Sequence, residues 1–186
     1  MGSEPSSYDA LVRPIQEQML RSIWRVTRVA KDADDALQDS LTIIWKRRAR
    51  IQRRPPPQAP ILRICVNCAC DVLRARLRRR TRENALIDPD ALHAKDGPVG
   101  QPPDRQELHD DISRALVRLP SRHATAVVMR YMLELSYEEV GDALGCSEST
   151  ARVHVSRACK RLNDHSRRPW VYYVVMSSLN RNEVGN

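Results

Sequence analysis

Residues 136–162 read SYEEVGDALGCSESTARVHVSRACKRL, and this stretch decides the fold. Apolar residues recur in both of its halves at spacings of three and four, which places them on one face of a helix. Gly145 follows the last apolar residue of the first half, where a chain leaving a helix needs a positive φ, and Ser147 stands where an N-cap belongs. The pattern predicts two helices joined by a tight turn. The residues expected to be buried are Tyr137, Val140, Leu144, Ala151, Val155, Ala158 and Leu162.

The second of these helices has a polar and mostly cationic outer face, as a helix in a DNA major groove requires. We predict that this face binds DNA, with Val153 against a thymine methyl group and with Arg157 and Lys160 mainly on phosphates. The predicted DNA-binding residues are Glu148, Ser149, Thr150, Arg152, Val153, Ser156, Arg157 and Lys160. A purely structural hairpin with a solvated basic face is the alternative interpretation.

Composition and charge limit the kind of protein that this chain can be. Its 186 residues suffice for one ordinary domain or two small ones, and its formal net charge of +8 favours a polyanionic partner. No apolar run approaches the ~20 residues of a membrane span, and residues 1–9 lack the basic and apolar segments of a secretory signal. We therefore expect a cytoplasmic protein that does not insert into membranes.

The cysteines and histidines do not form a recognisable metal or catalytic site. Cys65, Cys68 and Cys70 follow a C-x-x-C-x-C pattern in one apolar helix, but the third points away from the first two and no histidine is near in sequence. We expect them to be buried small side chains in a reducing compartment. The sequence has no Ser/His/Asp arrangement, paired carboxylates or glycine-rich phosphate loop, so we expect no catalytic residue, metal or cofactor.

The first half of the chain predicts three helices, at about residues 8–30, 32–50 and 59–82. In the second of them, Leu37, Leu41 and Ile44 form the apolar stripe, and Asp32 or a neighbour can cap the first turn. Another face of the same helix carries an acidic patch formed by Asp34, Asp35, Gln38 and Asp39. Taken alone, this patch is most simply a solvated helix face.

Two cationic segments accompany these helices. Residues 46–54 contain six cations and no acid and lead into the prolines of 55–57, while residues 74–82 contain six arginines. Both segments suit contacts with phosphates, although the second is also consistent with a solvated helix end.

A change of composition separates the two halves. Residues 83–105 contain prolines, glycines and several acids with little periodicity, which predicts a flexible acidic linker. Helices at 106–119 and 121–133, divided by Pro120, are expected before the helix-turn-helix. The tail of 165–186 is consistent with a strand, a short helix or a partner-binding segment.

Three stretches resemble the sigma-70 family, specifically its extracytoplasmic-function (ECF) group. Residues 32–45, DADDALQDSLTIIW, are similar to the family's most typical helix, and residues 59–80 and 115–162 resemble further parts of its two domains. The resemblance implies an all-α protein of two small helical domains joined by a flexible linker. These are a region 2-like bundle at residues 8–82 and a region 4-like helix-turn-helix domain at residues 106–164.

The resemblance also implies partners and roles. The acidic patch would dock on the β′ subunit of core RNA polymerase, and the second domain would rest on the β subunit. The recognition helix would read the −35 element of promoter DNA, and an anti-sigma factor could be a further partner. The residues expected to hold the opened −10 element are Arg50, Arg53, Arg54, Arg63, Asn67, Arg74 and Arg78.

The function implied is that of an ECF-type sigma factor, which binds core polymerase and directs promoter-specific transcription initiation. Within it, the linker would either thread the nucleic-acid channel or act as a simple tether. Two other classes stay open from the residues themselves. A stand-alone helix-turn-helix regulator would use only the second domain, and an interaction protein would imitate a sigma factor and titrate its inhibitor. The first of these leaves the acidic patch and both arginine-rich segments unexplained.

Overall fold

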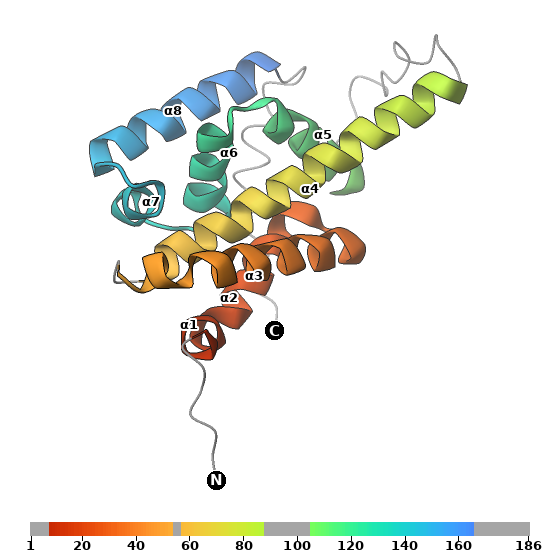
Figure 1. Cartoon of the computed structure of the whole chain (residues 1–186). Helices are drawn as coiled ribbons and strands as arrows, with labels where there is room; N and C mark the ends of the chain where they lie inside the picture. The colour runs from red at the N-terminus through yellow and green to blue at the C-terminus, as the bar shows by residue number, and fades with distance from the viewer. Residues whose placement is uncertain (1–7, 54–56, 88–104, 166–186) are drawn as a thin grey trace.

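The computed structural model describes residues 8–53, 57–87 and 105–165, and all the elements within these ranges are helical (Figure 1). This confirms the predicted all-α fold, with two helical regions on either side of the linker. The first region contains α1 (Asp9–Val12), the 3₁₀ segment η1 (Arg13–Ile15), α2 (Gln16–Thr27), α3 (Ala30–Gln52) and α4 (Gln58–Ile87). The second contains α5 (Arg105–Arg118), α6 (Ser121–Val127), the π-helical segment η3 (Val128–Met132), α7 (Tyr137–Leu144) and α8 (Glu148–His165). Most of the predicted linker, and the tail from residue 166, lie outside the described residues.

The N-terminal helix is interrupted where a single helix was expected. Pro14 lies in η1, because proline has no N–H to donate to the helical ladder. The chain then leaves α2 through Arg28, whose φ of 53° is in the left-handed region. The N-cap of α3 is Val29, which makes no side-chain cap, so the predicted capping by Asp32 or a neighbour is wrong. The Asp32 carboxylate instead forms an ion pair with Arg76 of α4 at 2.8 Å.

The core of the first region lies between α2, α3 and α4. Met19 and Ile23 of α2, Ile44 of α3 and Leu73 of α4 are all essentially buried. The apolar face of α3 is rotated slightly from the expected stripe, since Ala36 is buried and Leu37 and Leu41 are only half-buried. The buried residues at that face include the small side chains of Ala36 and Ser40. The buried Ser40 hydroxyl donates to the Ala36 carbonyl at 2.6 Å, which satisfies it inside the core.

The three clustered cysteines belong to this core. Cys65, Cys68 and Cys70 are buried along α4 as free thiols, as predicted. Burial raises the pKa of Cys65 and of Cys70 to about 12, which keeps both protonated at neutral pH. Their role is therefore that of small apolar side chains, which close packing of α4 requires.

The helix-turn-helix forms as its sequence predicts. Gly145 ends α7 with a φ of 67°, and the Thr150 backbone N–H donates to the Ser147 hydroxyl at 3.3 Å. A reciprocal capping box between Ser136 and Glu139 starts α7. The turn is tight, because a Cβ on Gly141 would lie 2.8 Å from the Cys146 carbonyl oxygen. The predicted stripe is confirmed at Val140, Leu144, Ala151, Val155 and Ala158, which are buried, whereas Tyr137 and Leu162 are half-buried.

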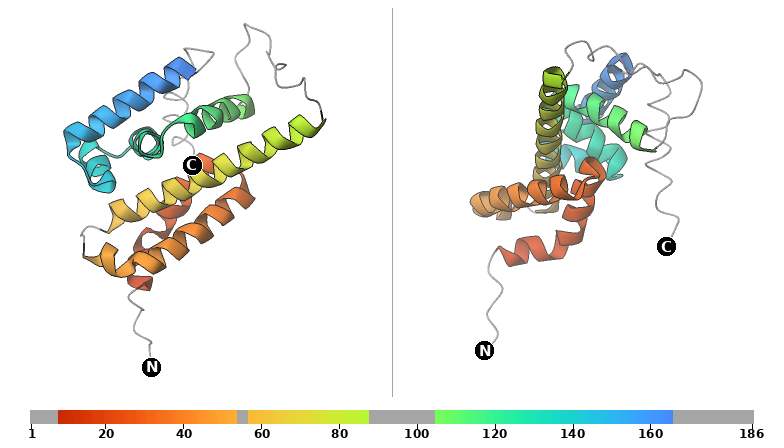
Figure 2. Two further views of the ribbon diagram at one scale, coloured as in Figure 1. Left: turned by 45° about the horizontal axis from the view of Figure 1, so that its top comes forward. Right: turned by 90° about the vertical axis from the view of Figure 1, so that its right-hand side faces the viewer.

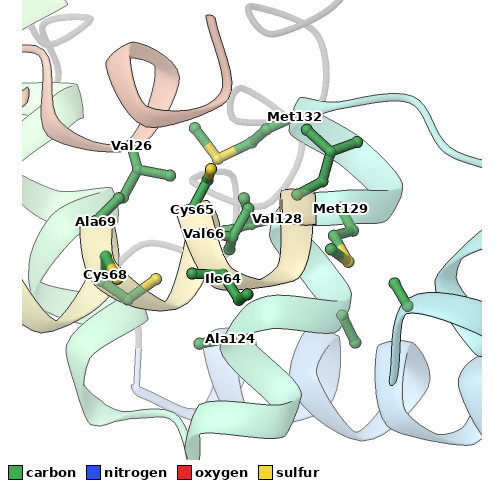
Figure 3. Packing of buried hydrophobic residues seen from close by; sticks show 14 of the residues in the cluster. Val26, Ile64, Cys65, Val66, Cys68, Ala69, Ala124, Val128, Met129 and Met132 are labelled. Carbon is green, nitrogen blue, oxygen red and sulfur yellow. The ribbon is translucent and has the colours of Figure 1, made fainter. Parts of the chain in front are cut away.

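The two regions pack against each other along α4. Figures 1 and 2 show α4 running between α2 and α3 on one side and α5, α6 and α7 on the other. Apolar side chains from both regions meet at this contact (Figure 3), where Val66 of α4 lies beside Val128 and Met129 of η3. No sequence pattern indicated this contact, in which the second region covers part of α4.

Polar side chains also cross between the regions. The Thr125 hydroxyl of α6 donates to the Asn67 side-chain oxygen of α4 at 2.6 Å. Arg63 donates to the Ala143 carbonyl at 3.2 Å, and Arg74 donates to the Leu119 carbonyl at 3.3 Å. Arg25 of α2 donates to the Met132 carbonyl. The contact is therefore apolar at its centre and is held by hydrogen bonds at several points around it.

Candidate nucleic-acid interface and acidic patch

The outer face of α8 is accessible along its length. Each of the eight DNA-binding residues predicted there is exposed, and Val153 leaves 44% of its surface open to solvent despite being apolar. The opposite face of the helix is fixed by Ala151, Val155 and Ala158, which are buried against the rest of the second region. The helix thus presents one face outward on a rigid support, which is the geometry that insertion into a groove requires.

Arg152 is held in place at the start of α8. Its guanidinium pairs with Glu148 one turn earlier, at 2.5 Å, and lies 4.3 Å from the ring centroid of Tyr137. Exposed ion pairs of this kind contribute about 0–1 kcal/mol, so Arg152 can leave Glu148 for another acceptor at little cost. Tyr137 supports the arginine from α7, a role that its place in the apolar stripe did not indicate.

A histidine pair lies between α8 and α6. His154 of α8 and His123 of α6 have ring centroids 5.5 Å apart, and both side chains are half-buried. Burial lowers the pKa of each histidine, and for His123 the neighbouring His154 lowers it further. Nearby arginines act in the same direction. Both rings therefore favour the neutral form at neutral pH.

The residues predicted to hold the −10 element fall into two groups. Arg50 and Arg53 at the end of α3 and Arg78 on α4 are exposed, and Arg54 lies outside the described residues. The other three are half-buried and engaged with the second region through the hydrogen bonds given above: Arg63, Asn67 and Arg74. On α3, Trp45 is half exposed and Arg48 lies 4.4 Å from its ring centroid.

The acidic patch lies on α3, on the side away from the core. Asp34, Asp35, Gln38 and Asp39 are all exposed. None of the three carboxylates makes an ion pair with another described residue, although the chain is strongly cationic. The structure therefore brings the four residues together on one accessible surface, separate from the predicted DNA-binding face of α8. Among the described residues, no helix combines the length and the apolar character needed to traverse a bilayer.

These features define a class: an all-helical protein with a helix-turn-helix whose second helix faces outward, and with a separate acidic surface. Residues 109–162 match the protein family described as Sigma-70, region 4. The ECF RNA polymerase sigma factor SigM of Mycobacterium tuberculosis is 31% identical over 84% of this chain and 75% of its own length. The corresponding SigE of Mycolicibacterium smegmatis is 30% identical over 86% of this chain, which spans 61% of that longer relative.

The chain belongs to the ECF group of RNA polymerase sigma factors. A weaker structural likeness, with a TM-score of 0.46 and 19% identity, extends to the sigma factor RpoE of Bartonella quintana in complex with the anti-sigma factor NepR. That likeness covers 84% of this chain and 94% of the RpoE chain.

Proposed function

We propose that this chain is a dissociable subunit that binds core RNA polymerase and directs transcription initiation at specific promoters. The observation that carries the proposal is the separation of two charged surfaces on two helical regions. One is the exposed acidic patch of α3, and the other is the exposed cationic face of α8. A stand-alone DNA-binding protein would need only the second of them.

The acidic patch is proposed to dock on the β′ subunit. Carboxylates that have no cationic partner within the described chain are available to pair with arginines and lysines of another protein. Asp35 and Asp39 are one helical turn apart, so they can engage one basic surface together. The flanking Asp34 and Gln38 extend that contact.

The recognition helix is proposed to read the −35 element. Its first turns, from Glu148 to Ser156, would meet base edges, whereas Arg157 and Lys160 would meet phosphates. The second region as a whole is proposed to rest on the β subunit of the polymerase.

The −10 element is proposed to bind along α4 and the basic end of α3. Because Arg63, Asn67 and Arg74 are engaged with the second region, this step requires that region to leave α4. Their hydrogen-bonding groups would then become available to the opened strand. The contact between the regions and the contact with the −10 element are thus alternatives.

The remaining parts of the proposal follow from these partners. We infer that the chain contributes no catalytic residue or cofactor, that it acts in the cytoplasm beside the polymerase, and that an anti-sigma factor can regulate it. The division into a docking and melting domain at residues 8–82 and a −35-reading domain at 106–164 belongs to the same proposal.

Run-off transcription with core polymerase tests it directly. Adding the chain should produce promoter-specific transcripts that core polymerase alone does not make.

The double substitution Asp35→Ala and Asp39→Ala should abolish co-elution with core polymerase while leaving binding of α8 to duplex DNA intact. Glu17→Ala with Glu138→Ala removes the same charge from other exposed positions and should leave both activities unchanged. Duplex binding that is unaffected by polymerase, without any transcript, would contradict the proposal and favour a stand-alone regulator.

A further inference from the structure

An arginine-lined pocket lies between α4 and α5. These two helices come directly before and after the linker in the sequence, and they belong to different regions. Its volume is about 510 Å³, which falls in the range of small-ligand sites. Figure 2 shows α5 beside the C-terminal part of α4. The arginines that line the pocket are Arg74, Arg78 and Arg82 from α4 and Arg114 and Arg118 from α5.

The spacing of these arginines arranges them in two rows. On α4 they recur every four residues, so that they follow one face of the helix over about 12 Å. On α5 the two arginines are also four residues apart. The apolar residues Leu77 and Val117 share the lining, and both are half-buried. The pocket is thus lined by cations from both regions.

Acidic partners neutralise only some of the arginines that line this pocket. Arg74 pairs with Asp71 at 2.7 Å and Arg114 pairs with Asp111 at 2.5 Å. The other three arginines form no ion pair with any residue that the structure describes, and no acidic side chain is among the described residues of the lining. Like charges that line one pocket repel one another, so an anion that enters the pocket is stabilised by their combined charge.

Guanidinium groups select among anions by shape as well as charge. Their planar donors match phosphate oxygens in bidentate pairs, and an extended row of them matches a chain of phosphates better than a single anion. We propose that this pocket binds an oligophosphate, either free or as the phosphate chain of a nucleotide. Because α4 and α5 belong to different regions, the bound anion bridges them and holds the second region on α4. This inference goes beyond polymerase docking and does not depend on it.

Calorimetric titration of the full chain with sodium tripolyphosphate tests the proposal. We expect saturable binding of one anion per chain and a rise in the melting temperature. Arg82→Gln with Arg118→Gln removes one exposed cation from each row and should weaken binding at least about ten-fold. Arg13→Gln with Lys31→Gln makes the same charge change at exposed positions outside the pocket and should leave tripolyphosphate binding unchanged.

Titration with GTP distinguishes a nucleotide from a free oligophosphate as the ligand. Tighter binding than tripolyphosphate, lost in the Arg82/Arg118 variant, indicates a nucleotide, and equal binding indicates the phosphate chain alone.

Several results would overturn the proposal. One is an equal effect of sodium sulfate at matched ionic strength, which would mean charge screening only. Another is equal weakening in the two double variants. Binding that appears only when the linker acids Asp88, Asp90, Asp96 and Asp104 are changed to Asn would identify the linker as the occupant. Tighter binding of a random single-stranded oligonucleotide, lost in the Arg82/Arg118 variant, would make the pocket part of a nucleic-acid path.

Discussion

Replacing Thr125 by Val tests whether the second region covers α4 in solution. The Thr125 hydroxyl has one proton and lies within hydrogen-bonding distance of both the Asn67 side-chain oxygen, at 2.6 Å, and the Ser121 carbonyl, at 2.8 Å. Opening the contact breaks only the first of these bonds, because Ser121 belongs to the same helix as Thr125. Valine has a similar shape but cannot donate, so the substitution acts on the bond between the regions. Thr125 is not among the residues proposed to touch polymerase or DNA.

The size of the effect follows from one neutral hydrogen bond. Such a bond contributes about 0.5–1.5 kcal/mol, which corresponds to a shift of about two- to twelve-fold toward the open arrangement. If the closed arrangement dominates, the affinity for a single-stranded −10 oligonucleotide should increase by the same factor, because the competent fraction limits the apparent affinity. Fluorescence anisotropy with a labelled oligonucleotide measures this change.

The control is Thr27→Val, which removes a buried hydroxyl whose hydrogen bond among the described residues lies within its own helix, to the Ile23 carbonyl at 3.1 Å. This variant should lose some stability without a gain in oligonucleotide affinity. An unchanged or reduced affinity in Thr125→Val, with a normal melting transition, would refute the reasoning. An unchanged affinity would mean that Asn67 and the rest of that face are already free in solution.

Three other substitutions or conditions probe the second region. Arg152→Ala should cost about 1–3 kcal/mol of discrimination at one base position of the −35 element, measured by competition between promoter variants; a uniform loss across all bases would indicate a phosphate contact instead. Gly141→Ala should lower the melting temperature, because the new Cβ would lie 2.8 Å from the backbone oxygen of Cys146, and that contact costs up to about 3 kcal/mol against a gain of about 1 kcal/mol in helix propensity; a rise would show that the turn adapts. Folding lowers the pKa of His123 and of His154, so the unfolded chain binds more protons and stability should fall as the pH drops through about 6.5. Thermal melts at successive pH values should show a weaker dependence when both histidines are changed to Gln, and an unaltered dependence would count against the pair.

The sequence predicted what local chemistry controls. The turn at Gly145, the cap at Ser147 and the buried stripe of α8 depend on residues a few positions apart, and the structure confirms them. The exposure of the acidic patch could also be inferred, because a helix that buries Ile44 must turn its acids elsewhere. What these exposed faces bind was implied by the family resemblance rather than by periodicity.

Contacts between residues far apart in the sequence could not be predicted from local patterns. Thr125 and Asn67 are 58 positions apart, and nothing in either neighbourhood marks the other as its partner. The same holds for Asp32, which looked like a helix cap and is instead the partner of Arg76. The π-helical turn of η3, expected as ordinary helix, likewise has no distinctive sequence pattern. Apolar faces on α4 and α6 indicate that something covers them without specifying what does.

The protonated, buried thiols of α4 can report on the exposure of this helix to solvent. Only a thiolate reached by solvent reacts readily with an alkylating reagent, so Cys65 and Cys70 should stay unmodified for as long as α4 remains packed on all sides. The half-buried Cys146 and Cys159 of the second region supply a comparison within the same chain. Mass spectrometry can follow the rate at which each cysteine of the unaltered protein is alkylated. The rate at Cys65 and Cys70, compared with that at Cys146 and Cys159, therefore measures how often α4 becomes exposed to solvent, without a dye or an engineered residue.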